Sequence, residues 1–237
     1  MLRLNTIYPA FMGECNVHGI GVPCTFVRLA GCNLRCYEKT KGVLCDTPEA
    51  LSPFSGKQVS EDYILKEVRE YGRKVICLTG GEPLRQDVTK LLTLLSNEGY
   101  FVVVETNGSK SIAPYRHIRN VSFVVDVKTT STGEAEHMDE TNYSLLDEND
   151  FVKFVVDTEE DYNDFHSWVS CHDYLKCKIA VGLFWGSEIT YAWLFNNITH
   201  FASRLPIYLN MQTHKMICLY DSYSKEEFGK LFIPKEL

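Results

Sequence analysis

Short continuous apolar runs alternate with amphipathic segments along most of the chain beyond residue 74. Apolar runs of this length, bounded by polar residues and glycines, are typical of strands buried in a parallel sheet. The runs predict strands at 75–78, 101–104, 123–125, 151–156 and 179–181.

The amphipathic segments carry apolar residues at helical spacing, which predicts helices that pack one face on the sheet. Gly72 and Gly99 are placed to end the first two helices. Thr158 and Asp161 have the spacing of a capping box at the start of the third. The predicted helices cover about 60–71, 88–95, 158–169 and 191–201.

Strands that alternate with helices indicate a parallel sheet covered by helices. Polar residues stand at the ends of three predicted strands, at Thr79, Glu105 and Asp126. In barrels of this kind the functional site lies at the carboxyl edge of the strands. We therefore expect an α/β fold, a partial (incomplete) TIM-type barrel. Because no interdomain linker is evident, a single domain is expected over residues 1–237.

The composition is that of a globular protein: 45% of the 237 residues are hydrophobic and 23% are charged. The longest apolar runs, such as 179–185, fall far short of the roughly 20 residues that span a bilayer. Residues 1–6 have no apolar core like that of a signal peptide. We therefore expect a cytoplasmic protein with no membrane partner.

The formal net charge of −7 is concentrated in one segment. Residues 129–150 contain no lysine or arginine, and their seven acids equal the whole net charge. We expect this acidic segment to be a mobile loop. The chain has no basic stripe of the kind that binds phosphate backbones, so direct nucleic-acid binding is not expected. The acids are Glu134, Glu136, Asp139, Glu140, Asp147, Glu148 and Asp150.

Nine cysteines are a high number for a chain of this length. For a cytoplasmic protein, metal binding or redox chemistry explains them better than disulfides do. Cys77 lies within an apolar run and is expected to be a core residue.

Cys32, Cys36 and Cys45 are the candidate metal ligands. Thiolates are the preferred ligands of iron–sulfur clusters. Three of them satisfy three irons of a 4Fe–4S cluster and leave the fourth iron open, and a catalytic metal site needs such an open position. The spacing alone fits equally well a structural zinc site completed by His18, or thiols that bind no metal.

Two further motifs follow predicted strands. Residues 79–83 read Thr-Gly-Gly-Glu-Pro, in which the glycines let the backbone approach a ligand and Glu82 offers a carboxylate to an ammonium group. Residues 105–108 read Glu-Thr-Asn-Gly. Each motif in isolation is best explained as a turn.

Together, in this order and spacing, the three motifs resemble the radical S-adenosylmethionine (SAM) superfamily. The resemblance implies a barrel of the radical SAM type, with a 4Fe–4S cluster on Cys32, Cys36 and Cys45 in a cluster-binding loop, residues 32–45. It implies that the open iron binds the amino and carboxylate groups of SAM. One electron then splits SAM into methionine and a 5′-deoxyadenosyl radical that abstracts hydrogen from the substrate.

A narrower resemblance covers nearly the whole chain and points to the 7-carboxy-7-deazaguanine synthase family. The similar segments are 8–14, 21–28, 45–47, 126–128, 152–156 and 212–215. The resemblance implies a carbon–nitrogen lyase that contracts the ring of 6-carboxy-5,6,7,8-tetrahydropterin, with loss of ammonia, to 7-carboxy-7-deazaguanine. This reaction belongs to the biosynthesis of 7-deazapurines such as preQ0, queuosine and archaeosine, and it requires Mg²⁺ as well as SAM.

The resemblance also implies the roles of individual residues. Arg28 suits the substrate carboxylate because its planar fork can bind both oxygens, and Thr47 would hold Mg²⁺. The implied substrate residues are Phe11, Met12, Gly13, Glu14, Arg28, Thr79 and His214. The implied SAM residues are Gly81, Glu82, Asn107, Asp126 and Lys128.

The implied partners are the pterin substrate, an electron donor such as flavodoxin or ferredoxin, and a second copy of the chain in a homodimer. Two alternatives stay open at the level of sequence. One is an activase of the same superfamily, which makes a glycyl radical on a partner protein. The other is a non-catalytic interaction module that carries zinc or an iron–sulfur cluster.

The sequence departs from the family pattern in four places. Eight residues, 37–44, separate Cys36 from Cys45 where two are common. Cys15 follows Glu14 where glycine is usual, and residues 126–128 read Asp-Val-Lys in place of Ser-Pro-Lys. The tail beyond residue 215 is longer than expected.

Overall fold

The computed structural model describes residues 1–43, 45–172, 175–202 and 205–213. Within these ranges nine strands form one sheet, in the order β3-β1-β2-β4-β5-β6-β7-β8-β9. The strands are β1 (Leu2–Phe11), β2 (Pro23–Leu29), β3 (Lys57–Val59), β4 (Val75–Gly80), β5 (Phe101–Thr106), β6 (Val121–Val127), β7 (Phe151–Val156), β8 (Lys178–Leu183) and β9 (Ile207–Leu209).

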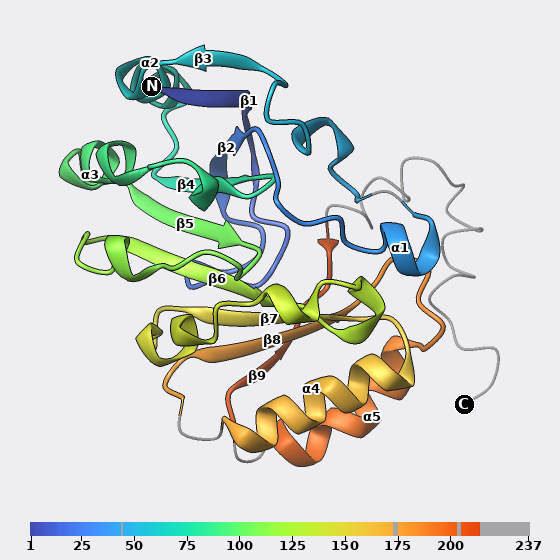
Figure 1. Ribbon diagram of the computed structural model, residues 1–237. Coiled ribbons are helices and arrows are strands. Elements are labelled where there is room, and N and C mark those ends of the chain that lie inside the picture. Colours follow the sequence, from blue (N-terminus) through green and yellow to red (C-terminus); the bar gives the residue numbers. More distant parts are fainter. Residues whose placement is uncertain (44, 173–174, 203–204, 214–237) are drawn as a thin grey trace, which may run out of the picture.

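Neighbouring strands are parallel from β2 through β4 to β9, whereas β1 is antiparallel to both β2 and β3. The edges of the sheet are β3 and β9, so the sheet curves without closing. The expected partial barrel is confirmed. In Figure 1 the arrow of β5 points to the right, and the carboxyl edge of the parallel strands therefore lies on that side.

The α-helices are α1 (Glu38–Lys41), α2 (Glu61–Tyr71), α3 (Thr89–Asn97), α4 (Glu159–Cys171) and α5 (Tyr191–Ala202). The four longer helices confirm the predicted ones. Ser60 caps α2 by accepting a hydrogen bond from the Tyr63 N–H, and Gly72 ends the helix in the left-handed conformation, φ 65°. Thr158 and Asp161 make both hydrogen bonds of the capping box at the start of α4.

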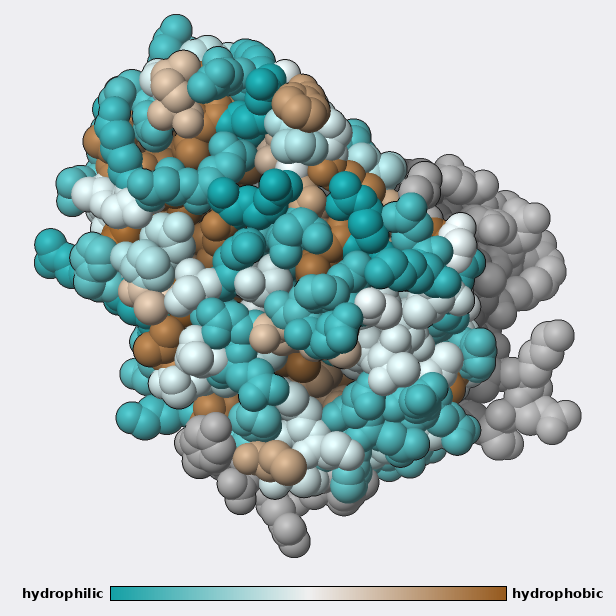
Figure 2. Space-filling view, in the orientation of Figure 1, coloured by the Kyte–Doolittle hydropathy of each residue, from teal (hydrophilic) through white to brown (hydrophobic). Residues whose placement is uncertain are grey.

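The helices cover the outer face of the sheet, α2 and α3 above and α4 and α5 below in Figure 1. The outer face of each central strand is buried against them in one large apolar core. The molecular face shown in Figure 2 is mostly hydrophilic, with apolar residues scattered over it. No helix among the described residues is long and apolar enough to span a membrane.

The inner face of the sheet changes character along the strands. Its amino-edge half is apolar, where Val75, Val124 and Phe151 belong to a second, smaller core. Cys77 is fully buried in this core, as expected. Two residues further along β6 and β7, on the same face, stand Asp126 and Lys153, which are paired in the register of the sheet. Polar chemistry therefore begins only near the carboxyl edge.

The loop between β1 and β2 crosses to the far edge of the sheet. The Thr213 N–H donates to Gly13 O (3.1 Å), and the Cys15 N–H donates to the side-chain oxygen of Asn210 (2.7 Å). Met12 is 1% exposed and packs in the inner core. The loop thus places Glu14 inside the curved sheet, next to strands that are distant in the sequence.

The acidic segment 129–150 is folded, contrary to the expectation of a mobile loop. Thr132, Glu134, Asn142 and Tyr143 are buried, so most of its length is packed against the barrel. The segment fails as a mobile loop because its acids accept hydrogen bonds from backbone donors instead of facing only solvent. It contains the 3₁₀ helices η4 (Thr130–Thr132), η5 (Ala135–His137) and η6 (Glu140–Leu145). Three others are η1 (Pro48–Ala50), η2 (Pro83–Arg85) and η3 (Ala113–Tyr115).

Candidate functional site

The turn after β4 is bonded directly to the start of the cysteine loop. The Glu82 N–H donates to Gly31 O (2.9 Å), and the Gly31 N–H donates to Ala50 O (2.7 Å). A Cβ on Gly81 would lie 2.6 Å from both Gly31 C and Ala50 O, and a Cβ on Gly80 would lie 2.1 Å from Leu29 O. Both glycines are therefore needed for the close approach of the chain's own backbone.

Cys32, Cys36 and Cys45 are brought together by this loop at the carboxyl edge. All three thiols are partly exposed. Burial raises the pKa of Cys36, and nearby Cys32 raises it further while Lys128 opposes the shift. Burial also raises the pKa of Cys45, to about 11, with Cys36 among the charges that contribute. Cys32 therefore acts on the pKa of Cys36, and Cys36 acts on that of Cys45.

Two N–H donors lie near the sulfur of Cys32. The Leu34 N–H lies 3.4 Å and the side-chain amide of Asn107 lies 3.6 Å from Cys32 Sγ. Within the described residues no three His, Cys, Asp or Glu side chains converge as they would around a single metal ion. Three ligands of a cubane each bind a different iron, so they do not have to converge on one point. Three thiols on one loop supply the type and number of ligands that a cubane with one open iron needs.

His18 lies far from the cysteines, which corrects the zinc site expected as an alternative. Its ring packs 5.1 Å from the ring of Phe101, centroid to centroid. Phe101 is the first residue of β5, at the amino edge of the sheet. The cysteine loop lies at the opposite, carboxyl edge, so His18 cannot complete a metal site with it.

Glu82 has no exposed surface, and its carboxylate is held by three donors of the chain. The Leu84 N–H (3.0 Å) and the Thr106 hydroxyl (2.7 Å) donate to Oε1, and the Asn107 N–H (2.7 Å) donates to Oε2. Burial raises the pKa of Glu82 to about 7, although these hydrogen bonds lower it. In this arrangement Glu82 joins the turn after β4 to the end of β5 and positions Asn107.

A chain of alternating charges crosses the inner face beside the cysteines. Asp126 accepts from Lys128 (2.5 Å) and lies 3.1 Å from Lys153 Nζ, which also donates to Glu14 (2.9 Å). Burial opposes the ionised form of Asp126, but the two lysines outweigh it and lower the pKa of this carboxyl. The buried charges are therefore compensated within the network.

Lys153 and Glu105 were missed as site residues from the sequence. Burial raises the pKa of the Glu105 carboxyl, against the opposing charge of Lys153 and a hydrogen bond from Thr79. The sequence signal for Lys153 was a single charged residue in the middle of the apolar run 151–156. In a strand with both faces covered, such a residue has to face a partner or a ligand.

Arg28 and Thr47 meet at the same edge. Arg28 Nη1 donates to Thr47 Oγ1 (3.2 Å), and Nη2 donates to Tyr8 Oη (3.3 Å). Thr47 Oγ1 lies 3.4 Å from a carboxylate oxygen of Asp46. A hydroxyl beside a carboxylate suits a cation that prefers oxygen ligands, such as Mg²⁺. Arg28 is opposite Thr79 in the register of β2 and β4.

Phe11 is not gathered with the other expected substrate residues. Its side chain is 63% exposed, and it pairs with Pro23 at the amino end of β2. The cysteine loop follows the other end of that strand. Glu14 and Gly13 do lie inside the curved sheet, whereas His214 is outside the described residues.

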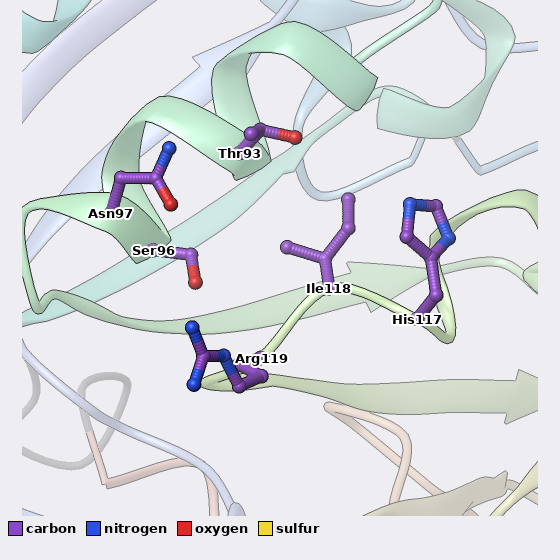
Figure 3. A pocket seen from close by; sticks show the side chains of 6 residues that line it. All are labelled: Thr93, Ser96, Asn97, His117, Ile118 and Arg119. Carbon is purple, nitrogen blue, oxygen red and sulfur yellow. The ribbon is translucent and has the colours of Figure 1, made fainter.

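A pocket elsewhere on the surface has no link to this site. It lies between α3 and the connection that leads into β6, at the amino edge of the sheet (Figure 3). Its lining offers no cysteine or carboxylate, and it is therefore set aside. The lining residues are Thr93, Ser96, Asn97, His117, Ile118 and Arg119.

Comparison with known proteins decides the family. No family model matches the sequence. A 7-carboxy-7-deazaguanine synthase from Chlorobaculum tepidum is 33% identical over 224 residues, which cover 91% of this chain and 94% of the relative. The chain belongs to the 7-carboxy-7-deazaguanine synthase family. A synthase from Methanospirillum hungatei is 31% identical over 92% of this chain and 86% of its own length.

The fold is also seen in a solved structure. The crystal structure of QueE from Escherichia coli matches with a TM-score of 0.66, over 88% of this chain and 93% of that one, at 20% identity. Membership in this enzyme family favours the ring-contraction hypothesis over the two alternatives, a glycyl-radical activase and a non-catalytic interaction module.

Proposed function

We propose that this protein contracts 6-carboxy-5,6,7,8-tetrahydropterin to 7-carboxy-7-deazaguanine by radical SAM chemistry. The observation that carries the proposal is family membership over nine tenths of the chain, joined to three cysteines at the carboxyl edge of a partial barrel. The reaction belongs to 7-deazapurine biosynthesis and releases ammonia.

Cys32, Cys36 and Cys45 would hold the 4Fe–4S cluster, with Asn107 beside Cys32. When bound, the cluster supplies the electron that splits SAM and so provides the radical that starts the reaction. Gly81 and the buried Glu82 hold the backbone of the turn after β4, which SAM would contact. Asp126 and Lys128 would offer a negative and a positive charge to the polar groups of SAM.

The substrate would lie deeper, over the inner face. Arg28 presents a planar donor fork there, suited to the carboxylate of the pterin. Glu14, Thr79 and Lys153 add carboxylate, hydroxyl and ammonium groups that are already oriented by neighbours. Thr47 would give one oxygen ligand to Mg²⁺, with the remaining ligands from substrate and water.

The proposal includes a one-electron donor protein such as flavodoxin or ferredoxin, a homodimer and a cytoplasmic location. Support for the donor comes from the electron that cleavage of SAM needs. A free metabolite is the proposed substrate, because the net charge of −7 opposes binding to nucleic acid.

The test is product analysis by mass spectrometry. Anaerobically reconstituted protein is incubated with SAM, a reductant, Mg²⁺ and the carboxypterin. We expect 7-carboxy-7-deazaguanine. Formation of 5′-deoxyadenosine without the deazaguanine would reject ring contraction and favour the activase. Zinc without iron or sulfide in the purified protein would favour the interaction module.

A further inference from the structure

The long insertion between Cys36 and Cys45 begins with a disfavoured backbone conformation. Tyr37 has φ 64°, and Asn120 is the other non-glycine residue with positive φ in the described part of the chain. This left-handed conformation is unfavourable for a bulky side chain and persists only where surrounding contacts impose it. The residue directly after a candidate cluster ligand is therefore held in place by its surroundings.

The first contacts of the insertion are with η4. The Tyr37 N–H donates to Thr132 O (2.9 Å), and the Thr40 hydroxyl donates to Ser131 O (2.5 Å). On the other side of Cys36, the Arg35 N–H donates to the buried carboxylate of Glu134 (2.8 Å). The residues on both sides of Cys36 are thus bonded to the same folded acidic segment.

The second set of contacts reaches the loops after β7 and β8. The ring of Tyr37 packs on Phe184, with centroids 4.4 Å apart. Lys41 forms an ion pair with Asp157, whose side chain is 0% exposed while that of Lys41 is 26% exposed. Removing one partner of such a buried pair leaves an uncompensated charge, so loss of the Lys41–Asp157 ion pair should lower the stability of the folded protein.

η4 and the loop after β7, which both contact the insertion, are hydrogen-bonded to the start of α4. Asp161, in the first turn of α4, accepts from the N–H groups of Asp157 and Ser131, at 2.9 Å each. Asp164, one turn later, accepts from the Thr130 N–H (2.8 Å). Both loops that hold the insertion therefore rest on one helix terminus, which favours carboxylates at these positions.

We propose that residues 37–42, here called the brace, hold Cys36 in position for cluster binding. The Lys41–Asp157 ion pair anchors the brace to the loop after β7. Lys41 is a positioning residue, since it acts on the cluster through the backbone of the loop. Figure 1 shows α1 at the right, the side to which the arrow of β5 points. The proposal rests on the proposed function, because it takes Cys36 as a ligand of the cluster.

The alternative is that the ion pair contributes only to general stability, and the chain offers a matched control. Arg116 pairs with Asp150 (2.8 Å), whose side chain is 1% exposed while that of Arg116 is 19% exposed. Each cation also has a second, more exposed acid, Asp147 (2.5 Å) for Arg116 and Glu188 (4.0 Å) for Lys41. Asp150 directly precedes β7 and accepts from the N–H of Phe123 in β6, near the amino edge. This pair resembles Lys41–Asp157 in burial and charge but lies away from the cysteine loop.

The experiment compares Lys41→Met, Arg116→Met and the wild type as full-length, anaerobically reconstituted proteins. Three properties are measured. They are the urea unfolding of each apoprotein, the rate of iron release to a chelator, and the electron paramagnetic resonance spectrum of the reduced cluster with SAM. We expect both variants to unfold at lower urea concentration. Only Lys41→Met should release iron faster than the wild type, and only Lys41→Met should change the spectrum. We expect release to be about tenfold faster, which is the usual size of an effect from residues that support metal ligands.

Two more variants keep the test decisive if Lys41→Met does not fold. Thr40→Val removes one exposed hydrogen bond of the brace and should speed iron release while the unfolding midpoint stays near that of the wild type. Lys41→Arg keeps the charge and should restore slow release. If Lys41→Met or Thr40→Val releases iron no faster than Arg116→Met does, the proposal that residues 37–42 position Cys36 is wrong. A wild type that assembles no cluster would instead refute the proposed function.

Discussion

Lys153 donates a 2.9 Å hydrogen bond to the carboxylate of Glu14, although the two residues are 139 positions apart in the sequence. Asn210 (3.2 Å) and Gln212 (2.9 Å) donate to the same carboxylate. Glu14 therefore joins the β1–β2 loop to β7 and to the segment after β9. One ionised group ties the middle of the sheet to both ends of the described chain.

This relationship predicts a pH dependence of stability. Burial raises the pKa of Glu14, but Lys153, Gln212 and Asn210 outweigh it and lower the pKa from 4.5 to about 2. Since the folded pKa lies below the unfolded value, the stabilisation is present above pH 4.5 and is lost as pH falls toward 2. The variant Glu14→Gln should therefore lose roughly 1–3 kcal/mol at pH 7 and show a flatter pH profile below 4.5.

The measurement is urea unfolding of the apoprotein between pH 2.5 and 7. The control is Glu98→Gln, which removes an exposed ion pair with Arg69 on the outer helices. That control should change stability by less than about 1 kcal/mol. A Glu14→Gln profile parallel to the wild type would show that folding does not lower the pKa of Glu14.

Gly81 gives a steric prediction. A Cβ there would lie 2.6 Å from the backbone of Gly31 and of Ala50, so Gly81→Ala has to push the start of the cysteine loop away from the turn. We expect a loss of roughly 1–3 kcal/mol in stability and little bound iron after reconstitution. Gly72→Ala is the control, because Gly72 has φ +65° and open space around it. It should lose about 1 kcal/mol from backbone strain and retain its iron; equal iron content in the two variants would contradict the steric argument.

The cysteine assignment predicts which thiols carry iron. Replacing Cys32, Cys36 or Cys45 with Ala should prevent assembly of a cluster with about four irons and four sulfides. Cys77→Ala should retain the cluster, since Cys77 is fully buried in the inner core, and should lose stability by about 1–2 kcal/mol through the cavity it leaves. Iron and sulfide analysis after anaerobic reconstitution checks both. Full cluster content in Cys45→Ala would overturn the assignment of Cys45 as the third ligand.

The fold could be predicted from the sequence where local pattern decides it. The runs at 75–78 and 151–156 became β4 and β7, because strands covered on both faces are mostly apolar. The cap at Thr158 and Asp161 was predicted for the same local reason. β1, β2, β3 and β9 were not predicted: β1 and β2 mix polar residues and proline into their length, and β3 and β9 have three residues each.

The site could be predicted only in part, because its key contacts are long-range. The Cys32 and Glu82 motifs lie together at the carboxyl edge, as parallel strands require. That Glu82 would be buried under three donors, and Gly81 pressed against Gly31, follows from how two loops pack. No spacing in the sequence contains that information. The same holds for Lys153, whose partners come from three distant segments.

The contact between Arg28 and Thr47 leads to the last prediction, which concerns Mg²⁺. Thr47 Oγ1 accepts from Arg28 Nη1 (3.2 Å) and lies 3.4 Å from Asp46 Oδ1. A neutral hydroxyl is a weak ligand, so Mg²⁺ should bind well only when substrate oxygens complete its coordination. Thr47→Val keeps the shape of the side chain and removes that oxygen. We expect product formation to fall about tenfold and to lose its response to Mg²⁺.

We expect this oxygen to act on the substrate and not on SAM, so Thr47→Val should still form 5′-deoxyadenosine at a rate close to that of the wild type. The measurement compares 7-carboxy-7-deazaguanine with 5′-deoxyadenosine, with and without Mg²⁺. Thr93→Val is the matched control, since its hydroxyl bonds only within α3, to Thr89 O. A full Mg²⁺ response in Thr47→Val would place the cation elsewhere. Equal loss of both products would show that Thr47 supports Arg28 and the cysteine loop and does not bind the metal.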